Sequence, residues 1–152
     1  MEVVLLGDSH LARIRRALPR ISANAINAAV GGATAADVLT QARAHLPTTN
    51  AIAVLSIGTN DARRGTRPEE CRELVKALVA ELACPWIYVR PPLTEHAVWG
   101  NAIASLRPDH LIDTPALLAP LGARAIASDG VHLTGSAYEL LLPEICTALS
   151  VV

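Results

Sequence analysis

Three residues of this sequence have types and spacing that allow nucleophilic chemistry. Ser9 follows the apolar run Val3–Leu6 after a Gly-Asp pair, so we expect its hydroxyl at the mouth of a buried strand and its amide at a helix N-terminus. A serine hydroxyl is a poor nucleophile until a base takes its proton. His132 is the candidate base, and Asp129, three positions earlier, is close enough to orient the imidazole. This set predicts acyl transfer through a serine.

Acyl transfer also needs hydrogen-bond donors for the negative charge that develops on the carbonyl oxygen. Gly32 permits close backbone approach, and Asn60 offers a side-chain amide. Together with the backbone N–H of Ser9 they predict an oxyanion hole with three donors. Each residue alone also has a purely structural interpretation: Ser9 as a helix N-cap, and Gly32, Asn60 and Asp129 as turn or loop residues. Those interpretations explain each residue but not the set.

Five short apolar runs and the helical segments between them must position these residues. The expected strands are Val3–Leu6, Ala25–Val30, Ala51–Ile57, Trp86–Val89 and Leu111–Ile112. The expected helices are Leu11–Leu18, Ala35–Leu46, Pro68–Leu82, Thr94–Leu106 and Gly135–Leu149. The runs do not alternate with polar residues, as is typical of strands buried on both faces of a parallel sheet. The alternation of the two types predicts an α/β sandwich with a parallel sheet of about five strands.

Two prolines help to predict where helices begin and where they are interrupted. Pro68, followed by acidic residues, fits the first turn of its helix. Pro143 lies inside the last helix and is expected to kink or divide it. In open sheets of this kind, ligands bind beyond the carboxyl ends of the strands, and the candidate residues fall in the loops that follow those ends.

Composition limits the class of protein. The 152 residues include 51% hydrophobic and 18% charged residues, which predicts a single folded domain over 1–152. Thirteen basic and 14 acidic side chains lack the basic excess that nucleic-acid binding needs, so we expect no nucleic-acid partner. No apolar run reaches the ~20 residues of a membrane span. The N-terminus has no signal-peptide pattern, and we expect a cytoplasmic protein.

The sequence also argues against a cofactor. Cys71, Cys84 and Cys146 are odd in number and widely spaced, which fits reduced thiols better than disulfides or a metal knuckle. The remaining histidines have no spacing typical of metal ligands. No phosphate-binding loop is present. We therefore expect neither a metal nor a nucleotide cofactor.

The blocks around these positions resemble those of the GDSL-type SGNH hydrolases. Gly-Asp-Ser at 7–9 resembles block I, Val-Gly-Gly-Ala-Thr at 30–34 block II, Gly-Thr-Asn-Asp at 58–61 block III, and Asp-Gly-Val-His-Leu at 129–133 block V. The resemblance spans residues 3–138. It implies a three-layer α/β/α, flavodoxin-like fold and metal-independent ester hydrolysis through an acyl-enzyme. It also implies Ser9, Gly32 and Asn60 as oxyanion donors, with Gly31 as the alternative to Gly32, and Asp8 as support for the block I turn.

Other residues near these blocks have two interpretations each, and Asp8 either supports the block I turn or contacts substrate. His10 departs from the aliphatic residue usual in the family, and we expect it to be structural or to contact substrate rather than to act as the base. Arg90 either fastens its loop or faces the pocket, and Trp99 either lines an acyl site or packs in the core.

Two groups of arginines are interpreted as solvated surface rather than as anion sites. Arg63, Arg64 and Arg67 follow Asn60, and Arg13, Arg15, Arg16 and Arg20 follow the nucleophile.

We therefore expect a hydrolase of short-chain acyl or O-acetyl esters of small molecules. A non-catalytic module that holds an acylated ligand is the alternative, and a flavodoxin-like signalling domain ranks below it. Esterase, thioesterase, carbohydrate O-deacetylase and lysophospholipase activities share these residues, and pocket shape decides among them. With little length for a lid, the site should be open and shallow. The oligomeric state is not set by the sequence.

Overall fold

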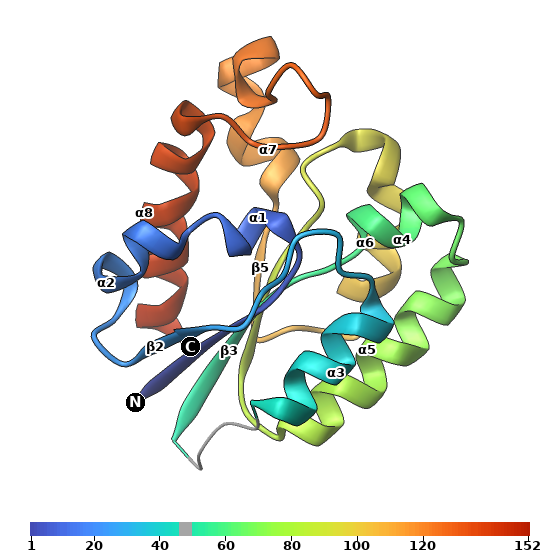
Figure 1. The fold of residues 1–152 in the computed structure, drawn as a ribbon, viewed down its shortest axis with the longest axis vertical. Coiled ribbons are helices and arrows are strands. Elements are labelled where there is room, and N and C mark those ends of the chain that lie inside the picture. Colours follow the sequence, from blue (N-terminus) through green and yellow to red (C-terminus); the bar gives the residue numbers. More distant parts are fainter. Residues whose placement is uncertain (46–49) are drawn as a thin grey trace.

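A computed structural model describes residues 1–45 and 50–152 and contains a central parallel sheet (Figure 1). Its strands are β1 (Glu2–Gly7), β2 (Ala25–Asn27), β3 (Ala51–Ser56), β4 (Trp86–Val89) and β5 (His110–Ile112). Their order across the sheet is β2-β1-β3-β4-β5, with every pair parallel. The five-stranded parallel sheet predicted from the sequence is confirmed. Because the chain leaves β1 toward β2 and returns on the other side as β3, the order reverses above β1, where such sheets bind ligands.

Helices cover both faces of the sheet (Figure 1). One face carries α1 (Ser9–Ala12), α2 (Leu18–Ile21) and α8 (Gly135–Val151), and the other carries α3 (Ala35–Ala44), α5 (Pro68–Leu82) and α6 (Ala97–Ala104). The short helices α4 (Thr59–Arg64) and α7 (Thr114–Leu118) follow β3 and β5. Three 3-10 segments complete the described elements: Arg15–Ala17, Thr94–His96 and Ala119–Ala125.

Each strand buries side chains on both sides of the sheet. Val3 and Leu5 enter the core beneath α1 and α8, whereas Val4 and Leu6 enter the core beneath α3 and α5. This alternation explains why the strands read as continuous apolar runs. The two cores are mainly aliphatic, and Tyr88 is the largest fully buried side chain.

The segment after the nucleophile differs from the expected single helix Leu11–Leu18. Helix α1 ends at Ala12, and tight turns take over, with Ile14 N–H bonded to Leu11 C=O and Ala17 N–H bonded to Ile14 C=O. Pro19 then lies in the first turn of α2, where a residue without an N–H is tolerated. The apolar spacing marked the buried side of this segment correctly but not its hydrogen bonding.

Other boundaries moved less. Strand β2 ends at Asn27, although Ala28 and Val30 still donate to the backbone of β1. The helix predicted from Pro68 is confirmed. Helix α8 continues through Pro143, so of the two expected effects, a kink or a division, the division does not occur. The predicted end of the helix at Leu46 lies outside the described residues.

The helix expected over Thr94–Leu106 consists of a 3-10 turn followed by α6. The sequence did not predict α4 or α7. No helix in the described part of the chain is both long and apolar enough to span a bilayer.

Candidate active site

Ser9 is the first residue of α1, directly above the carboxyl end of β1. The chain enters this turn through Gly7, whose φ is +149°, and a Cβ there would lie 2.3 Å from the backbone oxygen of Ser56. No other residue type fits such an approach, so the block I glycine is required by the sheet itself. Ser9 remains partly exposed while its neighbours are buried. The turn therefore presents one hydroxyl at the edge of the sheet.

Asp8 is the N-cap of α1 and is buried, at 1% exposure. Its Oδ1 accepts from the backbone N–H of His10 at 3.1 Å and from the Ser56 hydroxyl at 3.0 Å. Burial raises the pKa of Asp8 to about 7 against the opposing effect of these hydrogen bonds. This burial favours support of the turn over substrate contact as the role of Asp8.

His10 is buried, at 2% exposure. Its Nε2 lies 3.4 Å from the Thr59 hydroxyl, and its backbone C=O accepts from the Tyr138 hydroxyl at 2.8 Å. Burial lowers the pKa of His10 to about 4, so the ring is neutral at pH 7. This burial favours the structural interpretation of His10 over substrate contact.

Asp129 and His132 form a hydrogen-bonded pair in the loop before α8. Asp129 Oδ2 bonds His132 Nδ1, while Oδ1 accepts from the backbone N–H groups of Val131 and His132, at 2.9 Å each. The bond from the imidazole and these two amides hold the pKa of Asp129 well below its usual range. With Nδ1 engaged by a carboxylate, the proton of a neutral imidazole stays on Nδ1 and Nε2 is the free basic nitrogen.

Ser9 and His132 border the same hollow. It has a volume of about 430 Å³ and is completed by Ala12, Gly31 and three arginines, which are Arg13, Arg15 and Arg16. The structure thus brings the predicted nucleophile and base, from opposite ends of the chain, to one opening. The arginines were expected only as an exposed helix face, and their place at the site was missed.

The loop after β2 makes a tight turn beside Ser9. Ala33 N–H bonds Val30 C=O at 3.2 Å, with Gly31 and Gly32 at the centre of the turn and Gly32 at φ +79°. A Cβ on Gly31 would lie 3.9 Å from Ser9 Cβ. Neither central N–H bonds to any described part of the chain. Both amides are therefore available to a ligand next to the nucleophile.

Asn60 lies in the first turn of α4 rather than in a loop, and it is 7% exposed. One N–H of its Nδ2 donates to Ala33 C=O at 3.0 Å, which ties the side chain to the glycine turn and leaves a second N–H. The next residue, Asp61, accepts from Ala35 N–H at 3.0 Å and 3.2 Å. Asp61, which the sequence did not single out, thereby holds α3 and the glycine turn against α4.

Arg90 and Trp99 have structural partners. The Arg90 guanidinium bonds Asn101 Oδ1 and lies against Gly100, so it fastens the loop after β4 to α6. Trp99 donates its indole N–H to Thr66 C=O at 2.7 Å and packs against the core. Neither residue borders the hollow shared by Ser9 and His132. These contacts favour the interpretation in which both residues position α4 and α6 over the one in which they face substrate.

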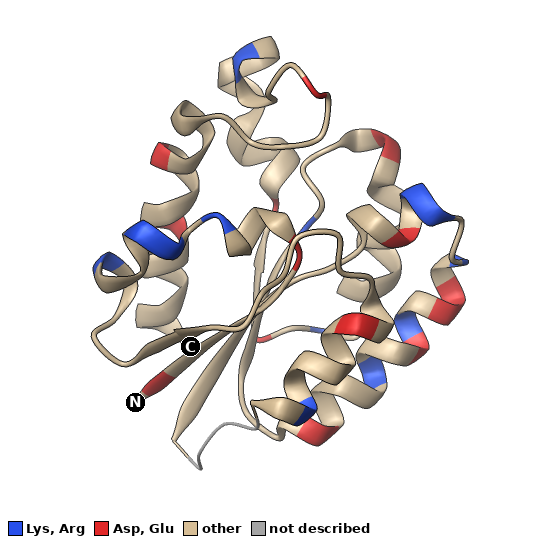
Figure 2. Ribbon diagram, in the orientation of Figure 1, with Lys and Arg blue, Asp and Glu red and all other residues tan. Residues whose placement is uncertain are grey.

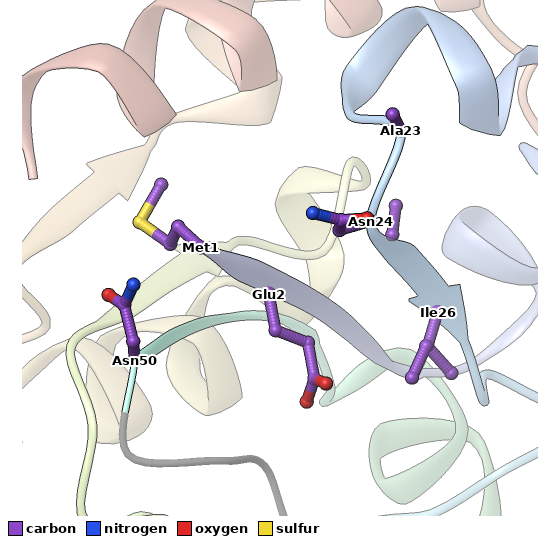
Figure 3. A pocket seen from close by; sticks show the side chains of 7 residues that line it. Met1, Glu2, Ala23, Asn24, Ile26 and Asn50 are labelled. Carbon is purple, nitrogen blue, oxygen red and sulfur yellow. The ribbon is translucent and has the colours of Figure 1, made fainter.

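Two further hollows have different surroundings. One of about 430 Å³ lies on the far side of the glycine turn and is lined by Val30, Gly31, Gly32, Ala33, Asp37, Thr40, Gln41, Ala44 and Arg64. Another lies at the amino ends of β1 and β2 (Figure 3), away from the catalytic loops, and is lined by Met1, Glu2, Ala23, Asn24, Ala25, Ile26 and Asn50. The latter holds none of the predicted site residues. Within 1–45 and 50–152, no group of three or more His, Cys, Asp or Glu side chains is placed to hold a metal ion.

A doubly wound parallel sheet with a serine, a glycine turn, an asparagine and an Asp–His pair around its switch point has the layout of an α/β serine hydrolase. Residues 6–140 match the GDSL-like Lipase/Acylhydrolase family, and the chain belongs to that family. No protein of curated function matches the sequence.

Solved structures share the fold. A member of the lipolytic protein G-D-S-L family from Veillonella parvula superposes with a TM-score of 0.79 at 14% identity, covering 100% of both chains. A Pseudoalteromonas esterase, EstA, superposes with a TM-score of 0.68 at 18% identity, covering 98% of this chain and 94% of the esterase. The catalytic domain of a peptidoglycan O-acetyltransferase from Streptococcus pneumoniae gives 0.72 at 20% identity, covering 98% and 92%. These likenesses show the fold, and the family match supports ester hydrolysis.

Proposed function

We propose that this chain hydrolyses carboxylic esters through an acyl-enzyme on Ser9, with His132 as general base and Asp129 as its orienting partner. The observation that carries the proposal is the common hollow bordered by Ser9 and by the His132 ring, whose Nδ1 is held by Asp129. Simple ligand binding does not need a nucleophile, a base and an orienting carboxylate at one opening. Membership in an acylhydrolase family supports the same reaction.

The proposed reaction has two symmetrical halves. His132 Nε2 takes the Ser9 proton as Oγ attacks the ester carbonyl, and then gives that proton to the departing alcohol as the carbon–oxygen bond breaks. Water repeats the sequence on the acyl-enzyme, which releases the acid and restores Ser9. The N–H groups of Ser9, Gly32 and Asn60 stabilise the oxyanion in both halves. The Asn60–Ala33 bond at 3.0 Å supports a preformed arrangement of these donors.

Short acyl chains fit the site best. The hollows on the two sides of the glycine turn are bordered by a four-residue helix, by the turn itself and by charged side chains such as Arg13, Asp37 and Arg64. An acyl chain of many carbons would find little apolar surface to bury there. We therefore place acetyl and other short acyl esters ahead of long-chain lipids, and one domain over residues 1–152 carries the whole site.

The test combines turnover with labelling of the nucleophile. Wild type should hydrolyse 4-nitrophenyl acetate faster than the octanoate and should react once with a fluorophosphonate probe at Ser9, as located by peptide mass spectrometry. Ser9→Ala should abolish both signals. Ser22→Ala is the matched control, because Ser22 follows α2 on the surface, and it should retain both. A wild type that neither turns over a panel of esters nor reacts with the probe would make this fold a binding module instead.

A further inference from the structure

Three arginines give one side of the site a strong positive charge. Arg13, Arg15 and Arg16 all border the hollow that contains Ser9 and His132, and all three are exposed. Figure 2 shows these cationic segments in succession along the chain between α1 and α2. No carboxylate among the described residues forms an ion pair with any of them. Their charge is therefore available to a ligand in the hollow.

The acidic side chain that orients His132 has partners other than the arginines. The carboxylate of Asp129 is already bonded to the His132 ring and to two backbone amides. The contrast is the hollow beyond the glycine turn, where Arg64 shares the lining with Asp37 and helps to lower the pKa of that carboxyl, after its bonds to Thr34. The hollow beyond the glycine turn is therefore lined by a cation and an anion, whereas the hollow at Ser9 and His132 is lined by cations that form no ion pair within the described part of the chain.

The charge of Arg13 acts on the catalytic turn, where Asp129 opposes it. Burial, followed by the charges of His132 and Arg13, lowers the pKa of His10, the residue after the nucleophile. Cations lining a concave surface with low-dielectric walls raise the local concentration and the association rate of anions. An ester that carries a negative charge would thus be concentrated at Ser9.

The geometry also distinguishes the two halves of the substrate. The carbonyl oxygen must point toward Gly32 and Asn60, and the leaving oxygen must lie within hydrogen-bond reach of His132. Gly31 lines both hollows, whereas Gly32 lines only the hollow of Arg64 and His132 only the hollow of Arg13, Arg15 and Arg16. The arginines consequently lie on the side of the departing alcohol.

Resting on the proposed function, we propose that the preferred substrates are carboxylic esters whose alcohol portion carries an anionic group, a phosphate or a carboxylate. Arg13, Arg15 and Arg16 bind that group and determine specificity, and the acyl portion stays small and uncharged. Guanidinium groups suit both anions, since their planar fork bonds two oxygens at once.

The first measurement follows phenol release from three aryl acetates with an anionic, a neutral or a cationic substituent on the alcohol: 3-acetoxybenzoate, methyl 3-acetoxybenzoate and 3-acetoxy-N,N,N-trimethylanilinium. Each kcat/KM is divided by the rate constant of alkaline hydrolysis to remove intrinsic reactivity. The benzoate should be preferred over the methyl ester by about tenfold, and the cation should be the poorest. Salt at 0.5 M should reduce the preference, because exposed charges are screened at that ionic strength. The analogous aryl phosphate, 3-acetoxyphenyl phosphate, tests the second anion.

The second measurement assigns the preference to the arginines. Changing Arg13, Arg15 and Arg16 together to Gln should reduce the preference for the benzoate to within about twofold of unity. Arg20→Gln is the matched control, because Arg20 is exposed on α2 but does not line the hollow, and it should keep the wild-type preference. The three single variants provide the same comparison if the triple variant melts early. A preference retained in all these variants would overturn the assignment.

Two further esters test the acyl side of the substrate. The acyl portion of 4-nitrophenyl hemisuccinate carries a negative charge, and that of 4-nitrophenyl valerate carries none. No preference for the hemisuccinate is expected, and a larger effect there than in the benzoate series would contradict the placement. If wild type turns over the neutral methyl ester through Ser9 but shows no charge preference, the anionic substrate class is wrong while the proposed function stands. If no ester in either series is hydrolysed, both proposals fail.

Discussion

The side-chain amide of Gln41, in α3, makes two hydrogen bonds with the backbone of Gly7, one to its N–H and one to its C=O, in the pattern of a neighbouring strand. The Gly7 N–H donates to Gln41 Oε1 at 2.9 Å, and Gln41 Nε2 donates to Gly7 C=O at 3.0 Å. Gly7 is the last residue of β1 and lies two positions before Ser9. The side chain of a helix on one face of the sheet therefore fixes the backbone that presents the nucleophile.

Replacing Gln41 by Ala should lower kcat on 4-nitrophenyl acetate by about tenfold to a hundredfold, because small displacements of a nucleophile are costly. The unpaired Gly7 N–H should also reduce the free energy of unfolding by about 1–3 kcal/mol. Gln41→Glu keeps an acceptor for the N–H but sets a carboxylate oxygen against the Gly7 C=O, so an intermediate loss of kcat is expected. Unchanged kcat in both variants, measured with their urea unfolding curves, would remove Gln41 as a positioning residue.

Asp129→Asn should reduce kcat by about 10³–10⁴-fold, because the amide favours the wrong imidazole tautomer. The loop should stay in place, since an Asn oxygen can still accept from the N–H groups of Val131 and His132. Steady-state kinetics and thermal melting check this together. A similar loss of kcat in Asp113→Asn, a change outside the catalytic loop, would point to a general structural effect instead.

The oxyanion donors can be separated by two glycine variants and one amide variant. Gly32→Ala forces a side chain into φ +79° and should lower kcat more than Gly31→Ala, whose backbone shows no such angle. Asn60→Ala should lower kcat by about 10²–10³-fold with a smaller change in KM. A larger loss of kcat for Gly31→Ala than for Gly32→Ala would assign the oxyanion amide to Gly31.

Asp8 and His10 should give opposite pH dependences of stability. The folded pKa of Asp8, about 7, lies above its ordinary 3.8, so its contribution to stability is lost as pH rises from about 4 to about 7. The folded pKa of His10, about 4, lies below its ordinary 6.5, so its contribution is gained as pH rises over about 4 to 6.5.

The pH dependences of stability due to Asp8 and His10 partly cancel in wild type, and each can be measured alone in a variant that lacks the other group. Between pH 4.5 and 7, Asp8→Asn should gain about 2–4 kcal/mol in free energy of unfolding relative to wild type. His10→Gln should lose stability relative to wild type over the same range. Urea unfolding at both pH values provides the measurement, and parallel changes in all three proteins would contradict the proton linkage.

The sequence predicted what depends on local chemistry and on burial. The strand Val3–Leu6 and the helix from Pro68 were predicted because a run buried on two faces and a proline in a first turn leave clear patterns. The break after Ala12 was not predicted, since Leu11, Ile14 and Leu18 face the core in either conformation. Periodicity reports which side of a segment is buried, not which hydrogen bonds it makes.

The catalytic side chains could be predicted because their chemistry demands particular residue types, whereas their supports could not. Gln41 acts through two backbone bonds to a residue 34 positions away, and nothing in its neighbourhood indicates that contact. The arginines after the nucleophile were interpreted as solvated surface, because the sequence pattern of an exposed charge is the same whether or not it borders a hollow. Only the position of α1 beside the His132 loop distinguishes Arg15 from Arg20.

The hydrogen bond from the Tyr138 hydroxyl to the backbone C=O of His10 bears on when the site assembles during synthesis. It joins residues 128 positions apart, and it locks the first turn of α8 to the helix that begins with Ser9. A chain emerging from the ribosome exposes Ser9 well before His132, which follows 123 residues later, and before α8, which anchors the His132 loop. The nascent protein is therefore expected to stay latent toward esters, and toward fluorophosphonate, until α8 docks.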